Sequence, residues 1–428
     1  MTKPNNVGVS APARHGKSGS PAASGIDTPE FRLIAACCRW PVSERRDAAI
    51  RDAAESVGDW DRFLWRANRH RVAGLVHEAL SSAASRLPAA VVDALAARGR
   101  HIARRNAILL AETVRLQRAL EAANIPCLML KGIALAQLAY GSLKTKHARD
   151  VDLLVPPDRV AAALHILERE GYALLYPAAQ LSEAQSRAVF RYAREVQLLH
   201  SGSRLLVEMQ WRLTNNPLLL RGVDTHSATQ RVALSDGVGI RTLAQDDLFS
   251  YLCVHGAQHA WSRLKWLADL NALASANIAD ILRLHRHAQS IGAGRCVGPA
   301  LLPCNRLFDL DLPAALKEEI DGDRGLQRLA RIAVETMSDE YAEAESGRRI
   351  IGAMRVLFAQ FLLGKGWAFL AAQYRAESVR TLDVVELPLP PALQFLYPVL
   401  RLLLWLWRRA MFVAKSAAIS ARALRSRP

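Results

Sequence analysis

The chain has few of the features that mark a secreted or disulfide-stabilised protein. Its 428 residues include only six cysteines, and these lack the short, even spacings of a disulfide framework or a zinc knuckle. No signal peptide is visible, because residues 1–29 are rich in Ser, Gly, Ala and Pro and contain no apolar core. We therefore expect a disordered leader over 1–29, buried free thiols and a cytoplasmic protein.

Aromatic residues are also scarce, at 6% of the chain, and no repeat with a period of 20 to 50 residues is present. Hydrophobic residues make up 51%, which is enough for a sizeable core, and the many Ala, Leu and Arg residues favour helices. Basic residues outnumber acids, with a formal charge of +16. That charge attracts nucleic acid, anionic lipid or phosphate-rich substrates, unless arginine is simply the preferred surface cation of a GC-rich genome.

The periodicity of apolar residues divides the chain into segments. Spacings of three and four predict an N-terminal helical domain over 30–124 and a C-terminal helical domain over 241–386. Between them, residues 125–240 predict a small α/β module, and residues 387–428 form a basic amphipathic tail. The expected fold class is therefore α+β, with a small mixed-sheet module embedded in a largely helical protein.

The module begins with the pattern of a strand, a tight turn and a helix. The apolar run 125–130 ends at Lys131 and Gly132, and residues 133–140 return to helical spacing. Glycine lets backbone amides approach a phosphate, the N-terminus of a helix favours anions, and lysine adds a point charge. These residues predict a phosphate-binding turn.

Two aspartates stand at alternate positions at the start of the next strand, residues 150–155. Asp150 and Asp152 leave the same face of that strand. Adjacent carboxylates repel each other unless one is protonated or a cation lies between them. Such oxygen ligands suit Mg²⁺ or Mn²⁺, and Mg²⁺ usually takes one or two carboxylates together with phosphate oxygens and water. Arg149 precedes the pair, where it can neutralise one acid or contact a phosphate.

A hairpin supplies a third acid. Segments 195–200 and 204–211 alternate around Ser201, Gly202 and Ser203. Glu208 falls on the second strand, whereas its neighbours Val207 and Met209 face the other way. Three carboxylates around a phosphate-binding turn predict a two-metal site suited to nucleotidyl transfer.

A family resemblance rests on Leu130–Gly132, Tyr140–Gly141 and Arg149–Val155. These segments resemble the signature of the bacterial uncharacterised nucleotidyltransferase family, which belongs to the DNA polymerase beta-like nucleotidyltransferase superfamily. The similarity continues at 207–211, 246–248, 255–269 and 387–390, although Gln210 stands where the family pattern has histidine. Genes of the family often accompany those for surface polysaccharides or peptide natural products.

The resemblance implies an NTP substrate and a glycan, peptide or other small-molecule acceptor. It assigns the catalytic and Mg²⁺-binding roles to Asp150, Asp152 and Glu208. It also implies that Lys131, Gly132 and Arg149 bind the nucleotide.

A second candidate site lies further along the chain. His255, His259, Ser262, Trp266 and Asp269 recur at steps of four and three, which predicts one face of a long helix. One interpretation is a substrate face, led by His255, His259 and Asp269, that closes over the cleft. The alternative is a set of satisfied histidines between packed helices.

The tail is both apolar and basic. Pro398 and Arg401 interrupt it, so its apolar run is too short for a transmembrane helix. After Val399 there are seven Lys or Arg residues and no acid. This pattern predicts an amphipathic helix at the anionic surface of the inner membrane, unless the helix packs on the helical domain instead.

Taken together, these features predict a Mg²⁺-dependent nucleotidyltransferase that moves an NMP group from an NTP to an unidentified acceptor. The alternative hypothesis is an inactive scaffold of the same fold at the membrane surface. A nucleic-acid-modifying transferase is less favoured, because no RNA-binding motif or aromatic platform is recognisable.

Overall fold

The computed structural model describes residues 25–82, 87–234, 237–275, 280–338, 350–401 and 403–408. Most of the predicted leader and the final part of the basic tail lie outside these residues. All six cysteines are free and buried, as predicted. In the described part of the chain, no helix is both long enough and apolar enough to cross a bilayer.

The chain opens with the predicted amphipathic helices. They are α1 (Pro29–Cys37), α2 (Glu44–Glu55), α3 (Trp60–Arg69), α4 (Ala73–Ser82) and α5 (Ala89–Ala122). The side chains of Thr28, Ser43 and Asp59 cap the first three by accepting a hydrogen bond from a backbone N–H of the first turn.

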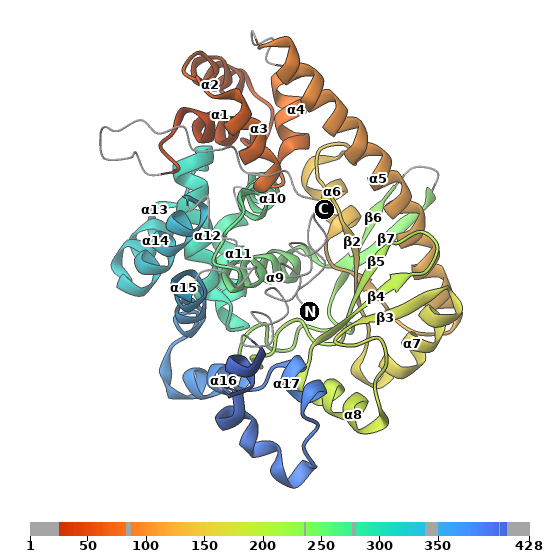
Figure 1. Ribbon diagram of the computed structural model, residues 1–428. Coiled ribbons are helices and arrows are strands. Elements are labelled where there is room, and N and C mark those ends of the chain that lie inside the picture. Colours follow the sequence, from red (N-terminus) through yellow and green to blue (C-terminus); the bar gives the residue numbers. More distant parts are fainter. Residues whose placement is uncertain are drawn as a thin grey trace, which may run out of the picture.

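Helix α5 is the longest element and passes from the N-terminal helices to the sheet (Figure 1). Its 34 residues extend over about 51 Å. Its first part buries Val91 and Leu95 in the core of the helical region, whereas its second part buries Leu109, Leu116 and Leu120 in the core beneath the sheet. One helix therefore contributes to both hydrophobic cores.

The module is built on a five-stranded mixed sheet. In chain order its elements are β1 (Leu128–Met129), α6 (Gly132–Tyr140), β2 (Asp150–Leu154), η1 (Pro157–Arg159), α7 (Val160–Arg169), β3 (Tyr172–Tyr176), α8 (Glu183–Tyr192), β4 (Glu195–His200) and β5 (Leu206–Gln210). The strand order is β1-β2-β5-β4-β3; β2 and β5 run parallel, and the other neighbours are antiparallel. The predicted strand–turn–helix unit, the aspartate strand and the β4–β5 hairpin are all present.

Some local predictions need correction. The apolar run 125–130 is a strand only at Leu128–Met129, because only these two residues are in register with residues of β2 in the antiparallel ladder. Between β2 and β3 the chain forms the 3₁₀ turn η1, which continues directly as α7. A second, two-stranded sheet of β6 (Thr229–Ala233) and β7 (Gly239–Leu243) was not anticipated.

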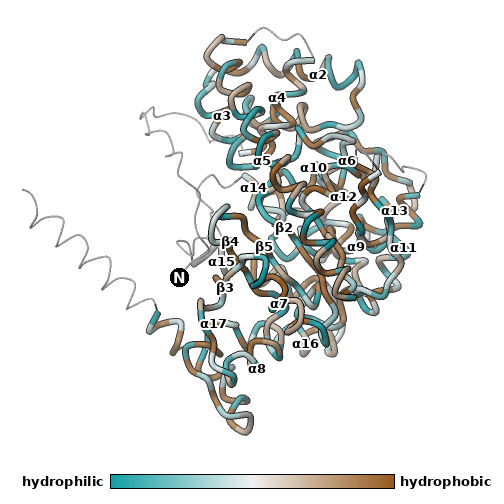
Figure 2. The backbone as a smooth tube through the Cα atoms, turned by 90° about the vertical axis from the view of Figure 1, so that its right-hand side faces the viewer, coloured by the Kyte–Doolittle hydropathy of each residue, from teal (hydrophilic) through white to brown (hydrophobic). Residues whose placement is uncertain are grey.

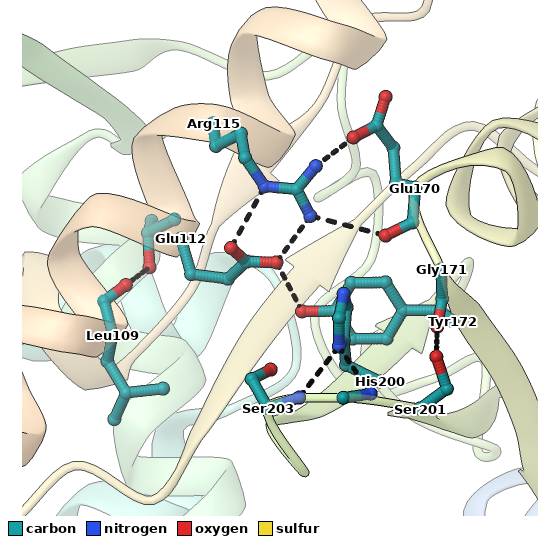
Figure 3. Close-up of polar contacts among 11 residues, drawn as sticks. Leu109, Glu112, Arg115, Glu170, Gly171, Tyr172, His200, Ser201 and Ser203 are labelled. Carbon is teal, nitrogen blue, oxygen red and sulfur yellow. Dashed lines mark hydrogen bonds and ion pairs between the residues drawn. The ribbon is translucent and has the colours of Figure 1, made fainter.

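Polar contacts fasten α5 to the edge of the sheet (Figure 3). Arg115 forms ion pairs with Glu112, at 2.7 Å, and with Glu170 at the end of α7. Glu112 also accepts a hydrogen bond of 2.6 Å from the Tyr172 hydroxyl on β3. On the adjoining hairpin turn, His200 Nδ1 accepts hydrogen bonds from two backbone N–H groups. These contacts hold α5 against the end of α7 and the edge strand β3.

The second helical region lies on the other side of the sheet from α5 and α7 (Figure 1). Its elements are α9 (Gln245–Gln258), α10 (Leu264–Ser275), α11 (Ile281–Ser290), α12 (Gly294–Phe308), α13 (Ala314–Gly322), α14 (Arg324–Ser338), α15 (Ile350–Phe361), α16 (Gly366–Ser378), α17 (Thr381–Glu386) and η5 (Pro391–Leu396). Helices α9 and α12 include strongly hydrophobic segments inside this region (Figure 2), and most of their residues are buried.

The prediction of one long helix over 255–269 is wrong. Helix α9 ends at Gln258, the backbone of Ala260 and Trp261 has positive φ, and α10 begins at Leu264. The turn folds the buried Trp261 back onto Gly256, where a Cβ would lie only 2.3 Å from the indole ring. The backbone N–H of Trp261 donates a hydrogen bond to the Gly256 carbonyl at 2.9 Å. Burial of the indole ring offsets the cost of this backbone conformation.

Candidate active site

The three predicted acids lie on one face of the sheet because β2 and β5 are parallel neighbours. In that register Asp152 lies beside Glu208, and Asp150 is two residues earlier on the same face of β2. Val207 and Met209 belong to the hydrophobic core on the opposite face, as predicted. The pleat of the sheet therefore separates a charged face from an apolar one.

The turn between β1 and α6 brings a lysine to these acids. The Leu130 N–H donates to the Asp152 carbonyl at 3.0 Å, which fixes the turn against β2. Lys131 Nζ then lies 2.9 Å from Asp152 Oδ1 in a nearly buried ion pair. Gly132 has a φ of +57°, and a Cβ there would approach the Asp150 carbonyl to 3.3 Å. A glycine is the residue best suited to this position.

Burial and mutual repulsion govern the charges of the acids. Burial and the nearby Glu208 raise the pKa of Asp150 above its ordinary value. Burial, only partly offset by Lys131, raises the pKa of Asp152 to about 7. Burial alone would lower the pKa of Lys131, but the combined attraction of Asp152, Tyr251 and Glu208 outweighs it and leaves that pKa well above its ordinary value. A bound cation would stabilise the ionised form of these carboxylates and lower their pKa values.

The donor set fits a magnesium ion that arrives with phosphate. Among the described residues, no three His, Cys, Asp or Glu side chains are already gathered around one point. Mg²⁺ needs only one or two protein carboxylates, and Asp150 and Asp152 present two from one strand face. Glu208 is oriented by Gln197, whose amide Nε2 donates to its carboxylate at 2.8 Å.

All nine predicted site residues line a single cavity of about 160 Å³ between the sheet and the helical region. They are Lys131, Gly132, Arg149, Asp150, Asp152, Glu208, His255, His259 and Asp269. Gln210 is buried further along β5. Two segments that are distant in sequence, 131–152 and 255–269, therefore form opposite sides of one site.

The side formed by α9 and α10 is aromatic. The rings of His259 and Trp266 are stacked, with centroids 5.0 Å apart, and His255 meets His259 edge-on at 4.9 Å. Burial and the nearby Lys131 hold the pKa of His255 well below its ordinary value, so this imidazole is neutral at pH 7. The break between α9 and α10 leaves His255, His259 and Trp266 in the cavity wall, whereas Ser262 falls in the turn.

Asp269 has a structural role within this wall. It accepts a hydrogen bond of 3.0 Å from the Tyr140 hydroxyl and forms a buried ion pair with Lys146. Tyr140 ends α6, and Lys146 belongs to the loop that follows it. Asp269 therefore connects α10 to the module, and its charge is already compensated.

A buried asparagine holds the loop between α6 and β2 in place. Asn106 of α5 is fully buried, and its amide Nδ2 donates to the carbonyls of Leu143 and Lys146, both at 2.6 Å. Its Oδ1 accepts from the Ala148 N–H at 3.3 Å. In addition, Arg105 donates to the Arg149 carbonyl at 2.8 Å. The loop thereby enters β2 in a fixed position.

Several basic residues in the cavity wall were missed from the sequence: Arg71, Lys146, His147, Arg263 and Lys265. Each is a basic residue in or beside a turn, which in sequence looks the same as a solvated surface cation. Burial and the neighbouring arginines lower the pKa of His147 to about 3, so it is neutral.

A carboxylate-bearing mixed sheet, a lysine–glycine turn at a helix N-terminus and a covering helical region define a nucleotidyltransferase-type protein. The chain belongs to the uncharacterised nucleotidyltransferase family, whose sequence model matches residues 56–309. No curated protein matched the chain. The matched segment contains both sides of the cavity, and this membership supports a general role in nucleotidyl transfer.

Proposed function

We propose that this protein is a Mg²⁺-dependent nucleotidyltransferase that moves an NMP group from an NTP to an acceptor. The observation that carries the proposal is the convergence of Asp150, Asp152 and Glu208 with the Lys131–Gly132 turn in one cavity. Membership of a nucleotidyltransferase family supports this proposal, because nucleotidyl transfer uses carboxylates beside a phosphate-binding turn.

Each residue has a defined task in this reaction. Asp150 and Asp152 would hold Mg²⁺, and the bound ion would supply Lewis-acid activation of the triphosphate. Lys131 leaves Asp152 and contacts a phosphate oxygen, helped by backbone N–H groups at the start of α6. The acceptor oxygen attacks the α-phosphorus, its proton passes to the Glu208 carboxylate, and the bond to the β-phosphate oxygen breaks to release pyrophosphate.

The aromatic wall supplies a contact surface for the substrates. Trp266 and His259 present stacked rings to the cavity, and a nucleobase gains energy by packing against such rings. The neutral His255 beneath them can donate or accept a hydrogen bond. This assigns His255 and His259 to substrate contact and Asp269 to support.

The test is pyrophosphate release from a panel of NTPs with glycan, peptide and small-molecule acceptors. We expect Mg²⁺-dependent release that Asp150→Asn or Asp152→Asn abolishes, and calorimetry should show loss of Mg²⁺·NTP binding in Asp152→Asn. The matched control is Asp158→Asn, because Asp158 is 75% exposed and outside the cavity. Unchanged Mg²⁺·NTP binding in Asp152→Asn contradicts the assignment.

The tail supports a second candidate function, that of a binding or scaffold protein at the membrane surface. Residues 397–401 and 403–408 are helical, and Phe395, Val399, Leu403 and Trp407 recur every four residues with 55–71% of their surface exposed. On the inner side of this helix, Arg408 pairs with Asp383 and Glu386. An outward apolar row on a segment rich in Lys and Arg suits an anionic bilayer.

Vesicle co-sedimentation tests this contact. The protein should bind vesicles that contain phosphatidylserine more strongly than neutral vesicles, and Trp407→Asp should weaken that binding. Val92→Asp is the matched control, because Val92 is an exposed valine on α5, distant in sequence from the tail. Membrane binding without pyrophosphate release under any condition favours the scaffold function. Equal vesicle binding by Trp407→Asp and Val92→Asp contradicts a membrane contact through the tail.

A further inference from the structure

The side chain of Tyr251 is buried on α9 beside the active site, with 1% of its surface exposed. Among the residues that the structure describes, none forms a hydrogen bond with its hydroxyl group. A buried hydroxyl without a partner destabilises the folded state, because it has lost its bonds to water and gained none in return. Such groups are few in native proteins, and a catalytic role is one reason why they are kept.

Helix α9 places Tyr251 next to the cavity wall but not in it. The following residues Leu252 and His255 line the cavity, whereas Tyr251 does not. Its ring lies with its centroid 6.0 Å from that of His255. On the sheet side, Lys131 Nζ lies 5.8 Å from the centroid of the same ring. Any effect of Tyr251 on a bound substrate must therefore pass through a neighbouring side chain.

Lys131 is the neighbour that can use this hydroxyl. Its ammonium is paired with Asp152 at 2.9 Å and lies over the tyrosine ring. Burial raises the pKa of Tyr251, and Lys131 is close enough to oppose that effect, although the two groups are not aligned as a hydrogen bond. Arg194 also lies near the hydroxyl, but it already donates to the Leu213 carbonyl at 2.8 Å. Lysine has a flexible stem and three N–H donors, so Lys131 can turn from Asp152 toward the hydroxyl.

We propose that Tyr251 is a positioning residue, whose hydroxyl oxygen accepts a hydrogen bond from Lys131 when Mg²⁺·NTP is bound. Once Asp152 ligates the cation, it no longer pairs with Lys131, and the tyrosine takes its place as the partner that orients the ammonium. A phenol oxygen holds the ammonium without cancelling its charge, whereas a carboxylate neutralises it. The full positive charge is then directed at the phosphate oxygens. This inference rests on the proposed function, because it concerns the lysine that binds the triphosphate.

The change of partner gives the hydroxyl opposite effects on stability and on binding. In the ligand-free protein Lys131 is drawn to Asp152, so the Tyr251 hydroxyl is left unsatisfied and destabilises the fold. With Mg²⁺·NTP bound the hydroxyl gains its partner, and this gain adds to the affinity. A hydroxyl with a purely structural role behaves differently, because its removal lowers stability and leaves ligand binding unchanged.

The experiment compares Tyr251→Phe with the unaltered protein by two measurements. Calorimetry with Mg²⁺ and a non-hydrolysable NTP analogue should show an affinity about fivefold lower or more, because a hydrogen bond to a charged group is lost. Urea unfolding of the metal-free protein should show the same midpoint or a higher one. Tyr397→Phe is the matched control, because the buried Tyr397 hydroxyl accepts from the Leu389 N–H at 3.0 Å and donates to the Leu387 carbonyl at 2.9 Å. This control should lower the urea midpoint and change the affinity for the analogue by less than about twofold.

A double-mutant cycle tests whether Tyr251 acts through Lys131. In a Lys131→Met background, Tyr251→Phe should cause no further loss of analogue binding. If Lys131→Met does not fold, Lys131→Gln replaces it with the same expected outcome. Unchanged analogue binding in Tyr251→Phe, a lower urea midpoint for that variant, or a further loss of binding in the Lys131→Met background overturns the proposal. Absence of analogue binding to the unaltered protein would instead refute the proposed function itself.

Discussion

Replacement of Asn106 by alanine tests whether a buried amide on α5 organises the active-site loop. The side chain has no exposed surface and makes three hydrogen bonds to the backbone of residues 143–148. Alanine leaves two carbonyls and one N–H without this partner in the protein interior. At about 1 kcal/mol or more for each buried group, the free energy of unfolding should fall by about 3 to 5 kcal/mol.

Urea unfolding followed by circular dichroism measures this loss, and Asn305→Ala provides the scale. Asn305 makes one hydrogen bond of this type, to the Leu310 carbonyl at 2.8 Å, so its replacement should cost about 1 kcal/mol. Asn106→Asp should be worse than alanine, because it turns a carboxylate toward two carbonyls. A loss for Asn106→Ala no larger than that for Asn305→Ala would refute the reasoning.

Asn106→Ala should also weaken Mg²⁺·NTP binding, because the cavity residues Lys146 and His147 lie on the loop that Asn106 holds. A variant that loses stability but binds Mg²⁺·NTP with the original affinity would show that the remaining contacts, with Arg105 and Asp269, are enough to hold the loop in position.

Three further outcomes are expected. Mn²⁺ binding, followed by electron paramagnetic resonance, should weaken below pH 7, because the pKa of Asp152 is raised to about 7 and a protonated carboxyl does not ligate. Since that pKa is raised from 3.8 in the folded state, metal-free protein should lose stability as the pH rises from about 4 to 7. Thermal unfolding at several pH values, with and without EDTA, measures this loss. Gly132→Ala should cost about 1 to 2 kcal/mol through its φ of +57° and reduce NTP affinity by calorimetry. Gly256→Ala should destabilise the protein by about 1 to 3 kcal/mol in urea, because the added methyl meets Trp261; a neutral effect would contradict that packing.

The sequence was most informative where the structural cause is local. Alternation along a strand placed Asp150 and Asp152 on one face, and the residues Ser201, Gly202 and Ser203 revealed the hairpin that brings in Glu208. Both patterns depend on neighbours a few residues away, so they are visible before the chain is folded.

The errors and omissions have non-local causes. Ala260 and Trp261 have positive φ in a turn that packs the Trp261 ring against Gly256, and neither residue type signals such a turn in the sequence. Arg71 and Lys265 become neighbours through hydrogen bonds between turns nearly two hundred residues apart. A single basic residue in a loop gives no sequence signal of such a partner.

Helix α5 has a consequence for how this protein can change over evolutionary time. Because one continuous helix is anchored by Val91 and Leu95 in one core and by Leu109 and Leu116 in the other, melting either core exposes apolar residues on the same helix. The two cores should therefore unfold together, as one cooperative unit. The α/β module is then not an independently exchangeable unit, and the cavity would change through side-chain substitutions in its wall rather than through exchange of the helical region around it.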